Sequence, residues 1–166
     1  MLLQGKSHKF GDDINTDYII SGKYKFNTLD MDEMAKHLME DLDSDFYQKI
    51  SPGDFIVAGR NFGCGSSREQ APLTIKYAGI SAVLAKSFAR IFFRNAVNTG
   101  LPVIECDTDN IDSGDELRLD LGKGLLTNKT KGITIALKPL PQVMISILNH
   151  GGLVTYFRKY GGFELI

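Results

Sequence analysis

The residues with the clearest chemical potential lie in a glycine-rich segment, G-R-N-F-G-C-G-S-S-R-E, which spans residues 59–69. It places the hydroxyl groups of Ser66 and Ser67 directly before the guanidinium group of Arg68. A guanidinium group binds a carboxylate through two parallel hydrogen bonds, and backbone N–H groups in a glycine loop stabilise negative charge. The segment therefore predicts a site for a small carboxylate or phosphate.

Other chemistries of glycine loops and cysteines do not fit this segment. A P-loop requires lysine before its Ser or Thr, whereas Gly65 precedes Ser66. A dinucleotide-binding loop requires a third glycine where Arg68 stands and an acidic residue about twenty positions later, and residues 84–90 contain none. Cys64 lacks the flanking pattern of thiol proteases, and the chain has no tryptophan. We expect Cys64 to pack as a small residue between glycines.

The same segment also fits a purely structural pattern. Ser66 and Glu69 match the S-x-x-E capping box that begins many helices. With Ser66 as the cap, Pro72 would lie inside the helix, where proline costs about 3 kcal/mol. A helix that begins a few residues later would place Pro72 in its first turn and leave both serines on a loop at the positive end of the helix. From the residues alone, both alternatives stay open.

Positive charge gathers around this segment, although the chain as a whole carries a net charge of -1. Between residues 55 and 104 the only acidic residue is Glu69, and the basic residues are Arg60, Arg68, Lys76, Lys86, Arg90 and Arg94. We expect the arginines to favour an anionic ligand, and Lys76 and Lys86 to form an ordinary solvated face. The overall charge argues against a protein that nucleic acid or a membrane attracts electrostatically.

The elements around the motif predict a mixed α/β fold in one domain, residues 1–166, because a chain of this length suits one domain of roughly 100–200 residues. A strand, a helix and a strand follow one another from residue 55 to residue 84, which predicts a parallel crossover. Apolar runs and alternation predict strands at 2–9, 55–58, 80–84, 101–105, 116–121 and 133–137. The last of these is expected to return along 116–121 after a turn at 122–124. Helical patterns cover 73–78, 88–98, 141–149 and a short segment after Gly152.

A further helix is predicted where apolar residues recur at helical spacing, with Asp30 and Glu33 as its N-terminal cap. We expect this stripe to pack in the core rather than to bind a cofactor. Its members are Met31, Met34, Ala35, Leu38, Met39 and Leu42.

Cysteine content and hydropathy limit which cofactors this chain could hold and where in the cell it is expected. Cys64 and Cys106 lack metal-ligand spacing, so this chain alone is not expected to hold zinc or an iron–sulfur cluster. No apolar stretch approaches the ~18 residues of a membrane span, and residues 1–6 lack the apolar core of a signal peptide. We therefore expect a cytoplasmic protein.

Three motifs together resemble a known family. Residues 59–69, the segment A-K-S-F-A-R-I-F-F-R-N at 85–95 and the D-I-N-T-D segment at 13–17 closely resemble small subunits of the 3-isopropylmalate dehydratase family. Those subunits correspond to the swivelling domain of aconitase. The resemblance covers nearly the whole chain in order and length, and it implies a single swivelling β/β/α domain.

The resemblance implies a two-chain hydro-lyase that isomerises 2-isopropylmalate and 3-isopropylmalate by dehydration and rehydration in leucine biosynthesis. A large subunit would hold a [4Fe-4S] cluster through three cysteines, its iron acting as a Lewis acid on the leaving hydroxyl, and this chain would bind no cofactor of its own. Ser66 would be the base that removes a proton beside a substrate carboxylate. Arg68 would bind a carboxylate and Ser67 would contact the substrate or an oxyanion. The supporting residues would be Asp17, Asn61 and Gly65.

The substrate is less defined, because residues 24–28 read Y-K-F-N-T where the family commonly has Y-L-R-T. Lys25 would suit the third carboxylate of a homoaconitate-type substrate, or it points to solvent. Phe26 would suit the alkyl group of isopropylmalate or of a methylated malate such as 2-methylmalate or 2,3-dimethylmalate. Gln70 stands where relatives often have histidine, a change without an interpretation here.

Two functions of other classes also stay open. A stand-alone module would bind carboxylates without an iron–sulfur partner. An RNA-binding protein would place the central arginines on phosphates, as the iron-responsive relatives of aconitase do. Salt-dependent RNA binding or partner-dependent dehydration would separate these hypotheses.

Overall fold

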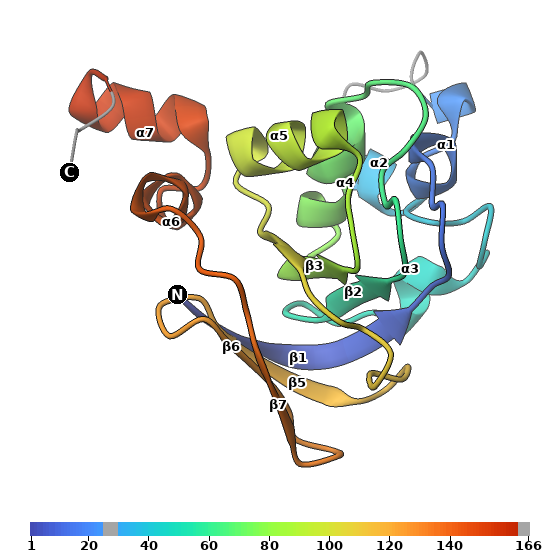
Figure 1. The fold of residues 1–166 in the computed structure, drawn as a ribbon. Helices are drawn as coiled ribbons and strands as arrows, with labels where there is room; N and C mark the ends of the chain where they lie inside the picture. Colours follow the sequence, from blue (N-terminus) through green and yellow to red (C-terminus); the bar gives the residue numbers. More distant parts are fainter. Residues whose placement is uncertain (25–29, 163–166) are drawn as a thin grey trace.

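The computed structural model describes residues 1–24 and 30–162, whose strands form one curved sheet in the order β4-β3-β2-β1-β5-β6-β7 (Figure 1). The mixed α/β class predicted from the sequence is confirmed. The strands are β1 Leu2–Lys9, β2 Phe55–Ala58, β3 Ala82–Ala85, β4 Val103–Glu105, β5 Glu116–Asp120, β6 Leu125–Asn128 and β7 Ile133–Ala136.

The first strand joins the two halves of the sheet. β1 runs parallel to β2 and antiparallel to β5. β2, β3 and β4 continue the parallel half, whereas β5, β6 and β7 form an antiparallel meander. The predicted crossover is confirmed, because β2 and β3 pair in parallel through a connecting helix. Their carboxyl ends therefore lie at one edge of the sheet.

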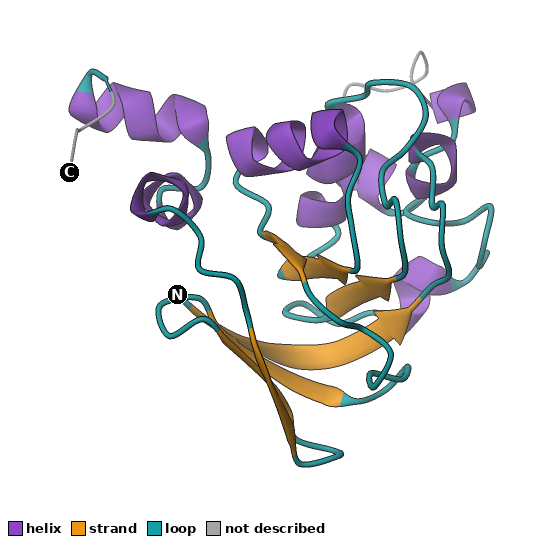
Figure 2. Cartoon of the chain, viewed as in Figure 1, coloured by secondary structure: helices purple, strands orange, loops and turns teal. Residues whose placement is uncertain are grey.

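The helices lie mainly on one side of the sheet (Figure 2). They are α1 Thr16–Ile19, α2 Met31–Ala35, α3 Phe46–Lys49, α4 Gln70–Tyr77, α5 Arg90–Thr99, α6 Gln142–Asn149 and α7 Leu153–Tyr160, with a 3-10 turn, η1, at Gly22–Tyr24. In the described part of the chain, no helix has both the length and the apolar character needed to cross a membrane.

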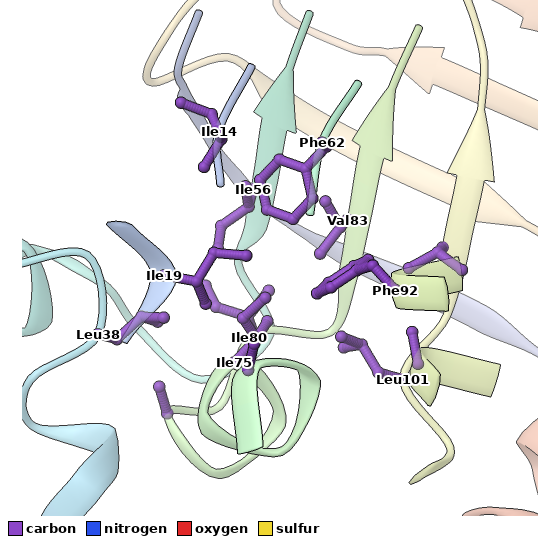
Figure 3. Packing of buried hydrophobic residues seen from close by; sticks show 14 of the residues in the cluster. Ile14, Ile19, Leu38, Ile56, Phe62, Ile75, Ile80, Val83, Phe92 and Leu101 are labelled. Atoms are coloured by element: carbon purple, nitrogen blue, oxygen red, sulfur yellow. The ribbon is translucent and has the colours of Figure 1, made fainter. Parts of the chain in front are cut away.

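The buried strands β2 and β3 divide their side chains between two apolar clusters. Ile56 and Val83 face the helices, where they pack with Ile75 and Phe92 (Figure 3). The alternate residues, such as Phe55, join a second cluster with the leucines of β5 and β6. Both faces of the parallel half are thus covered, which explains why these strands read as continuous apolar runs.

Four members of the methionine-containing stripe are buried as predicted, namely Met34, Ala35, Leu38 and Met39, but the helix is shorter than predicted. Asp30 caps it by accepting from the backbone N–H groups of Asp32 and Glu33. The helix α2 ends at Ala35, and Met39 has a left-handed φ of 58° that interrupts the helical path. Leu42 is consequently 41% exposed instead of facing the core.

The other differences between the predicted and the observed elements concern short strands and helices. The chain returns after residues 122–124 as β6, so the expectation that residues 133–137 form the return strand is wrong, and these residues lie in β7, the next strand of the meander. The sequence L-L-T-N of β6 shows neither a continuous apolar run nor a clear alternation, so no strand is predicted there. The helices α1 and α3 were also missed, since each has only four residues.

Lys76 does not belong to a solvated face, contrary to the expectation. Its Nζ donates to the carbonyl oxygens of Thr99 at 2.8 Å and Gly151 at 3.0 Å. Burial lowers the pKa of this amine. Lys76 therefore ties α4 to the end of α5 and to the turn between α6 and α7, while Lys86 forms an ion pair with the exposed Asp109.

Candidate active site

The serine and arginine loop lies beyond the carboxyl ends of β2 and β3, the edge of a parallel sheet where ligands commonly bind. Residues 59–69 leave β2, and residues 86–89 lead from β3 into α5. The two segments are tied together by Phe62, whose N–H donates to Ser87 at 3.0 Å and whose carbonyl accepts from Ala89 at 2.9 Å. The start of α5 is thereby placed beside the loop.

The D-I-N-T-D segment holds the other side of the loop. The carbonyl of Ile14 accepts from the N–H of Gly63 at 2.7 Å, and the N–H of Thr16 donates to the carbonyl of Cys64 at 2.8 Å. The buried hydroxyl of Thr16 then donates to the carbonyl of Ser66 at 2.8 Å. The segment at residues 13–17, about fifty residues away in sequence, thus holds the backbone of Ser66 in place.

Glycine is required at two positions of this loop. Gly63 has a φ of 80°, and a Cβ atom there would lie 2.1 Å from the ring of Phe92. Gly65 has a φ of 89°, a conformation that other residues rarely adopt. These two positions explain the glycine pattern without a nucleotide.

The loop presents its polar groups to a cleft. Ser66 and Ser67 are exposed, and among the described residues their hydroxyls and the backbone N–H groups of residues 65–68 have no hydrogen-bond partner. Successive free N–H groups of this kind favour an anion. The adjoining hollow has a volume of about 330 Å³, and it is lined by Thr16, Gly63, Gly65, Ser66, Ser67, Arg68, Ala89, Arg90, Ile91 and Phe92.

The structure brings Arg68 and Asp17 together. The Nη2 atom of Arg68 lies 2.6 Å from Oδ1 of Asp17, and Nη1 donates to the carbonyl of Ile20 at 3.2 Å. The Arg68 side chain is only 16% exposed, whereas Asp17 is 56% exposed. These two contacts, both with residues at α1, therefore fix the orientation of the Arg68 guanidinium group. Its other N–H groups are left for a ligand.

The remaining predicted site residues are Asn61, Lys25 and Phe26. Asn61 is absent from the lining of the cleft; its amide donates to the Oδ1 of Asp13 at 2.8 Å, and its φ is 59°. Asn61 thus shapes the base of the loop. Lys25 and Phe26 fall outside the described residues.

The capping-box interpretation of Ser66 is wrong. α4 begins at Gln70, with Glu69 at the N-cap and no side-chain cap hydrogen bond. The alternative, a later helix start with Pro72 in the first turn, is confirmed, although the helix begins before the predicted Leu73. Both serines are consequently free of a structural role at the helix end.

The two cysteines do not form a metal site in the described part of the chain, where no group of three His, Cys, Asp or Glu side chains could hold a metal ion. Burial raises the pKa of Cys106 to about 12, and burial together with the nearby Asp13 raises that of Cys64. Two cysteines are also fewer than the four thiolates that usually hold an iron–sulfur cluster.

Six residues that line the cleft were not assigned to the site from the sequence: Thr16, Gly63, Ala89, Arg90, Ile91 and Phe92. Ile91 is 55% exposed despite its apolar side chain. The signal for Arg90 was the excess of basic residues around the motif. No local pattern showed which of those residues faces the serines.

Comparison with known proteins agrees with this arrangement. A family model described as the aconitase C-terminal domain matches residues 14–109. A 3-isopropylmalate dehydratase small subunit from Archaeoglobus fulgidus is 62% identical over 165 residues, covering 99% of this chain and 100% of that protein. One from Caldicellulosiruptor bescii is 52% identical, covering 95% and 96%.

A solved structure extends the comparison to the fold. A crystal structure of 3-isopropylmalate dehydratase from Methanocaldococcus jannaschii superposes with a TM-score of 0.93 and 50% identity, covering 97% of this chain and 96% of that one. The similarity spans both the parallel and the antiparallel halves of the sheet. The chain therefore belongs to the aconitase C-terminal domain family, among the small subunits of 3-isopropylmalate dehydratase.

Proposed function

We propose that this chain is the small subunit of a hydro-lyase that interconverts 2-isopropylmalate and 3-isopropylmalate by dehydration and rehydration, a step of leucine biosynthesis. The observation that carries the proposal is the meeting of Ser66, Ser67 and Arg68 at one cleft with exposed serine hydroxyls. The names and full-length similarity of the relatives support the choice of substrate.

Ser66 is the proposed base, which takes the proton from the carbon beside a substrate carboxylate. A serine hydroxyl is a poor base in water, so its anion needs stabilisation in the site. The free backbone N–H groups of residues 65–68 supply donors in fixed positions, and Arg68 adds positive charge. Ser67 is placed to contact the substrate or the oxyanion that forms on it.

Arg68 is the proposed carboxylate clamp, and Asp17 keeps its guanidinium group in position. An ion pair on one edge of a guanidinium group leaves N–H groups on its other edges for a ligand. Thr16 and Gly65 hold the loop backbone in the conformation that presents both serines.

The remaining parts of the enzyme are proposed to lie on a large subunit. The described residues of this chain do not suit an iron–sulfur cluster, so the proposed holder of the [4Fe-4S] cluster is the partner. Proton transfer and carboxylate binding are the parts of the reaction assigned to this chain. Residues 1–166 would act as one domain that closes the partner's active site.

Reconstitution with a cluster-bearing large subunit tests the proposal. The two chains are co-expressed and tested with 2-isopropylmalate, 2-methylmalate, 2,3-dimethylmalate and the hydroxy acid that dehydrates to homoaconitate. Dehydration is monitored through the absorbance of the unsaturated product. Partner-dependent turnover of 2-isopropylmalate is expected. Exclusive turnover of another substrate would assign the chain to a different dehydratase, and RNA binding without turnover would refute the enzyme proposal.

A further inference from the structure

We propose that Arg90 binds one carboxylate of the substrate and so acts together with Arg68. This inference rests on the proposed function, since it concerns the same cleft and a substrate with two carboxylates. Arg90 is exposed, is the first residue of α5 and lines the cleft with Ser66, Ser67 and Arg68.

The charge of the cleft requires a second cation. Arg68 is ion-paired with Asp17 and also donates to the carbonyl of Ile20, so this pair contributes little net charge. A malate derivative has two carboxylates and carries about two negative charges at neutral pH. Arg90 is the other cationic side chain that lines the cleft. Within residues 1–24 and 30–162, no carboxylate lies within ion-pair distance of it.

The backbone around Arg90 adds to the positive electrostatic potential in the cleft. α5 has ten residues, and its N-cap Ala89 makes no side-chain hydrogen bond to the first turn. The positive end of the helix therefore faces the cleft without a capping carboxylate or hydroxyl. This end adds to the attraction that the Arg90 side chain provides for an anion.

The backbone position of Arg90 is fixed by the packing of its neighbour Phe92. The next residue but one, Phe92, is buried against Gly63 and lies with its ring centroid 5.2 Å from that of Phe62. The same loop continues to Ser66, so the start of α5 and the serine loop form one rigid unit. A bidentate ligand between Arg68 and Arg90 would be held in one orientation relative to Ser66.

Arg94 provides a matched control. It lies one turn later on α5, is also exposed and lines a different hollow of about 680 Å³ between α5 and the C-terminal helices. Arg90 lines both hollows, whereas Arg94 is absent from the lining of the serine cleft. Replacing either residue removes the same charge from the same helix.

The experiment measures kcat and KM of the reconstituted enzyme with Arg90→Ala, Arg90→Lys and Arg94→Ala. Arg90→Ala is expected to raise KM by about tenfold to a hundredfold, the usual effect of losing a charged hydrogen-bond partner, while Arg94→Ala leaves KM near the wild-type value. Arg90→Lys is expected to fall between them, because lysine keeps the charge but not the bidentate geometry.

Two results would overturn the inference. One is a KM of Arg90→Ala within about twofold of the wild type. The other is weakened assembly with the large subunit, measured by sedimentation, with an unchanged KM for the complex that remains, which would make Arg90 a docking residue.

Failure of the proposed function is recognised separately, in the wild-type enzyme. If wild type prefers another hydroxy acid of the panel, that acid replaces 2-isopropylmalate in the comparison. If wild type dehydrates none of them, calorimetric titration of the full chain with malate still measures the contribution of Arg90, and equal affinities of wild type and Arg90→Ala would refute it.

Discussion

The guanidinium group of Arg68 is paired with the carboxylate of Asp17 on the α1 side of the candidate active site, with Nη2 and Oδ1 at 2.6 Å. Asp17 is on α1 and more than half exposed, whereas Arg68 is largely covered. A pair of this kind contributes little to stability but restricts the direction of the guanidinium group. Its role is therefore expected to appear in kinetics rather than in unfolding.

Replacing Asp17 with Asn should lower kcat/KM by about tenfold, because Arg68 loses the partner that orients it. The melting temperature should change little, since Asp17 is more than half exposed and Arg68 keeps its hydrogen bond to the carbonyl of Ile20; ion pairs open to solvent contribute about 0–1 kcal/mol. Kinetics of the reconstituted enzyme and thermal unfolding of the chain check these expectations. Asp109→Asn, which breaks the surface pair with Lys86, is the control and should leave both measurements unchanged.

Ser66→Ala should fold and assemble but lose about a hundredfold to ten-thousandfold in kcat, the range expected for removal of a general base. Its hydroxyl makes no hydrogen bond to the described residues, so the melting temperature should stay near that of the wild type. Single-turnover kinetics with 2-isopropylmalate measures the loss. The exposed Ser44→Ala is the control, and near-normal turnover of Ser66→Ala would exclude the proposed base.

Gly63→Ala should destabilise the chain by about 3 kcal/mol or more, because the new methyl group would overlap the Phe92 ring at a left-handed φ. Gly114 also has a left-handed φ, of 89°, but a Cβ atom there meets no atom within 4 Å. Gly114→Ala should thus cost only the conformational part, about 1 kcal/mol. Denaturant unfolding compares the two, and equal losses would show that the Phe92 contact does not matter.

Glu40 should make stability depend on pH in the acid range. Burial acts against its ionisation, but hydrogen bonds from Lys23, Tyr24 and His37 outweigh burial and lower the pKa of Glu40 to about 2. A carboxylate whose pKa is lower in the folded chain contributes stability above its unfolded pKa of about 4.3, and that contribution is lost as pH falls toward 2.

Glu40→Gln therefore should destabilise the chain at neutral pH, and the difference from wild type should shrink between about pH 5 and pH 2. Unfolding free energies from denaturant titrations across this range check the trend. The exposed Asp41→Asn serves as the control. A difference that stays constant with pH would contradict the hydrogen-bonded carboxylate.

The anion-binding loop illustrates how local sequence information can carry a functional prediction. Ser66, Ser67 and Arg68 are adjacent, so their chemistry could be inferred without knowing what surrounds them. Pro72 argued against a helix cap at Ser66 because of its steric limits, and the observed start of α4 at Gln70 decided between the two alternatives. The capping box alone would have led to the wrong interpretation.

Lys76 and Arg90 illustrate the opposite situation. Both are basic residues in helices of the same region, yet Lys76 donates to two carbonyl oxygens and Arg90 lines the cleft. The sequence predicted an anionic ligand for the arginines and a solvated face for Lys76, and the second expectation is wrong. The environments of the two side chains depend on which elements pack against each helix.

The sequence by itself determined the residues 2–9 and 55–58 as strands, the parallel crossover after β2 and the chemistry of the serine and arginine loop, since each depends on neighbouring residues. Only the tertiary structure decided that Asp17 pairs with Arg68 and that α5 begins beside Ser66. These contacts join segments far apart in the chain. They follow from the order of strands in the sheet, which places β1 parallel beside β2 and so brings the segment after β1 to the same edge as the serine loop. No local pattern specifies that order.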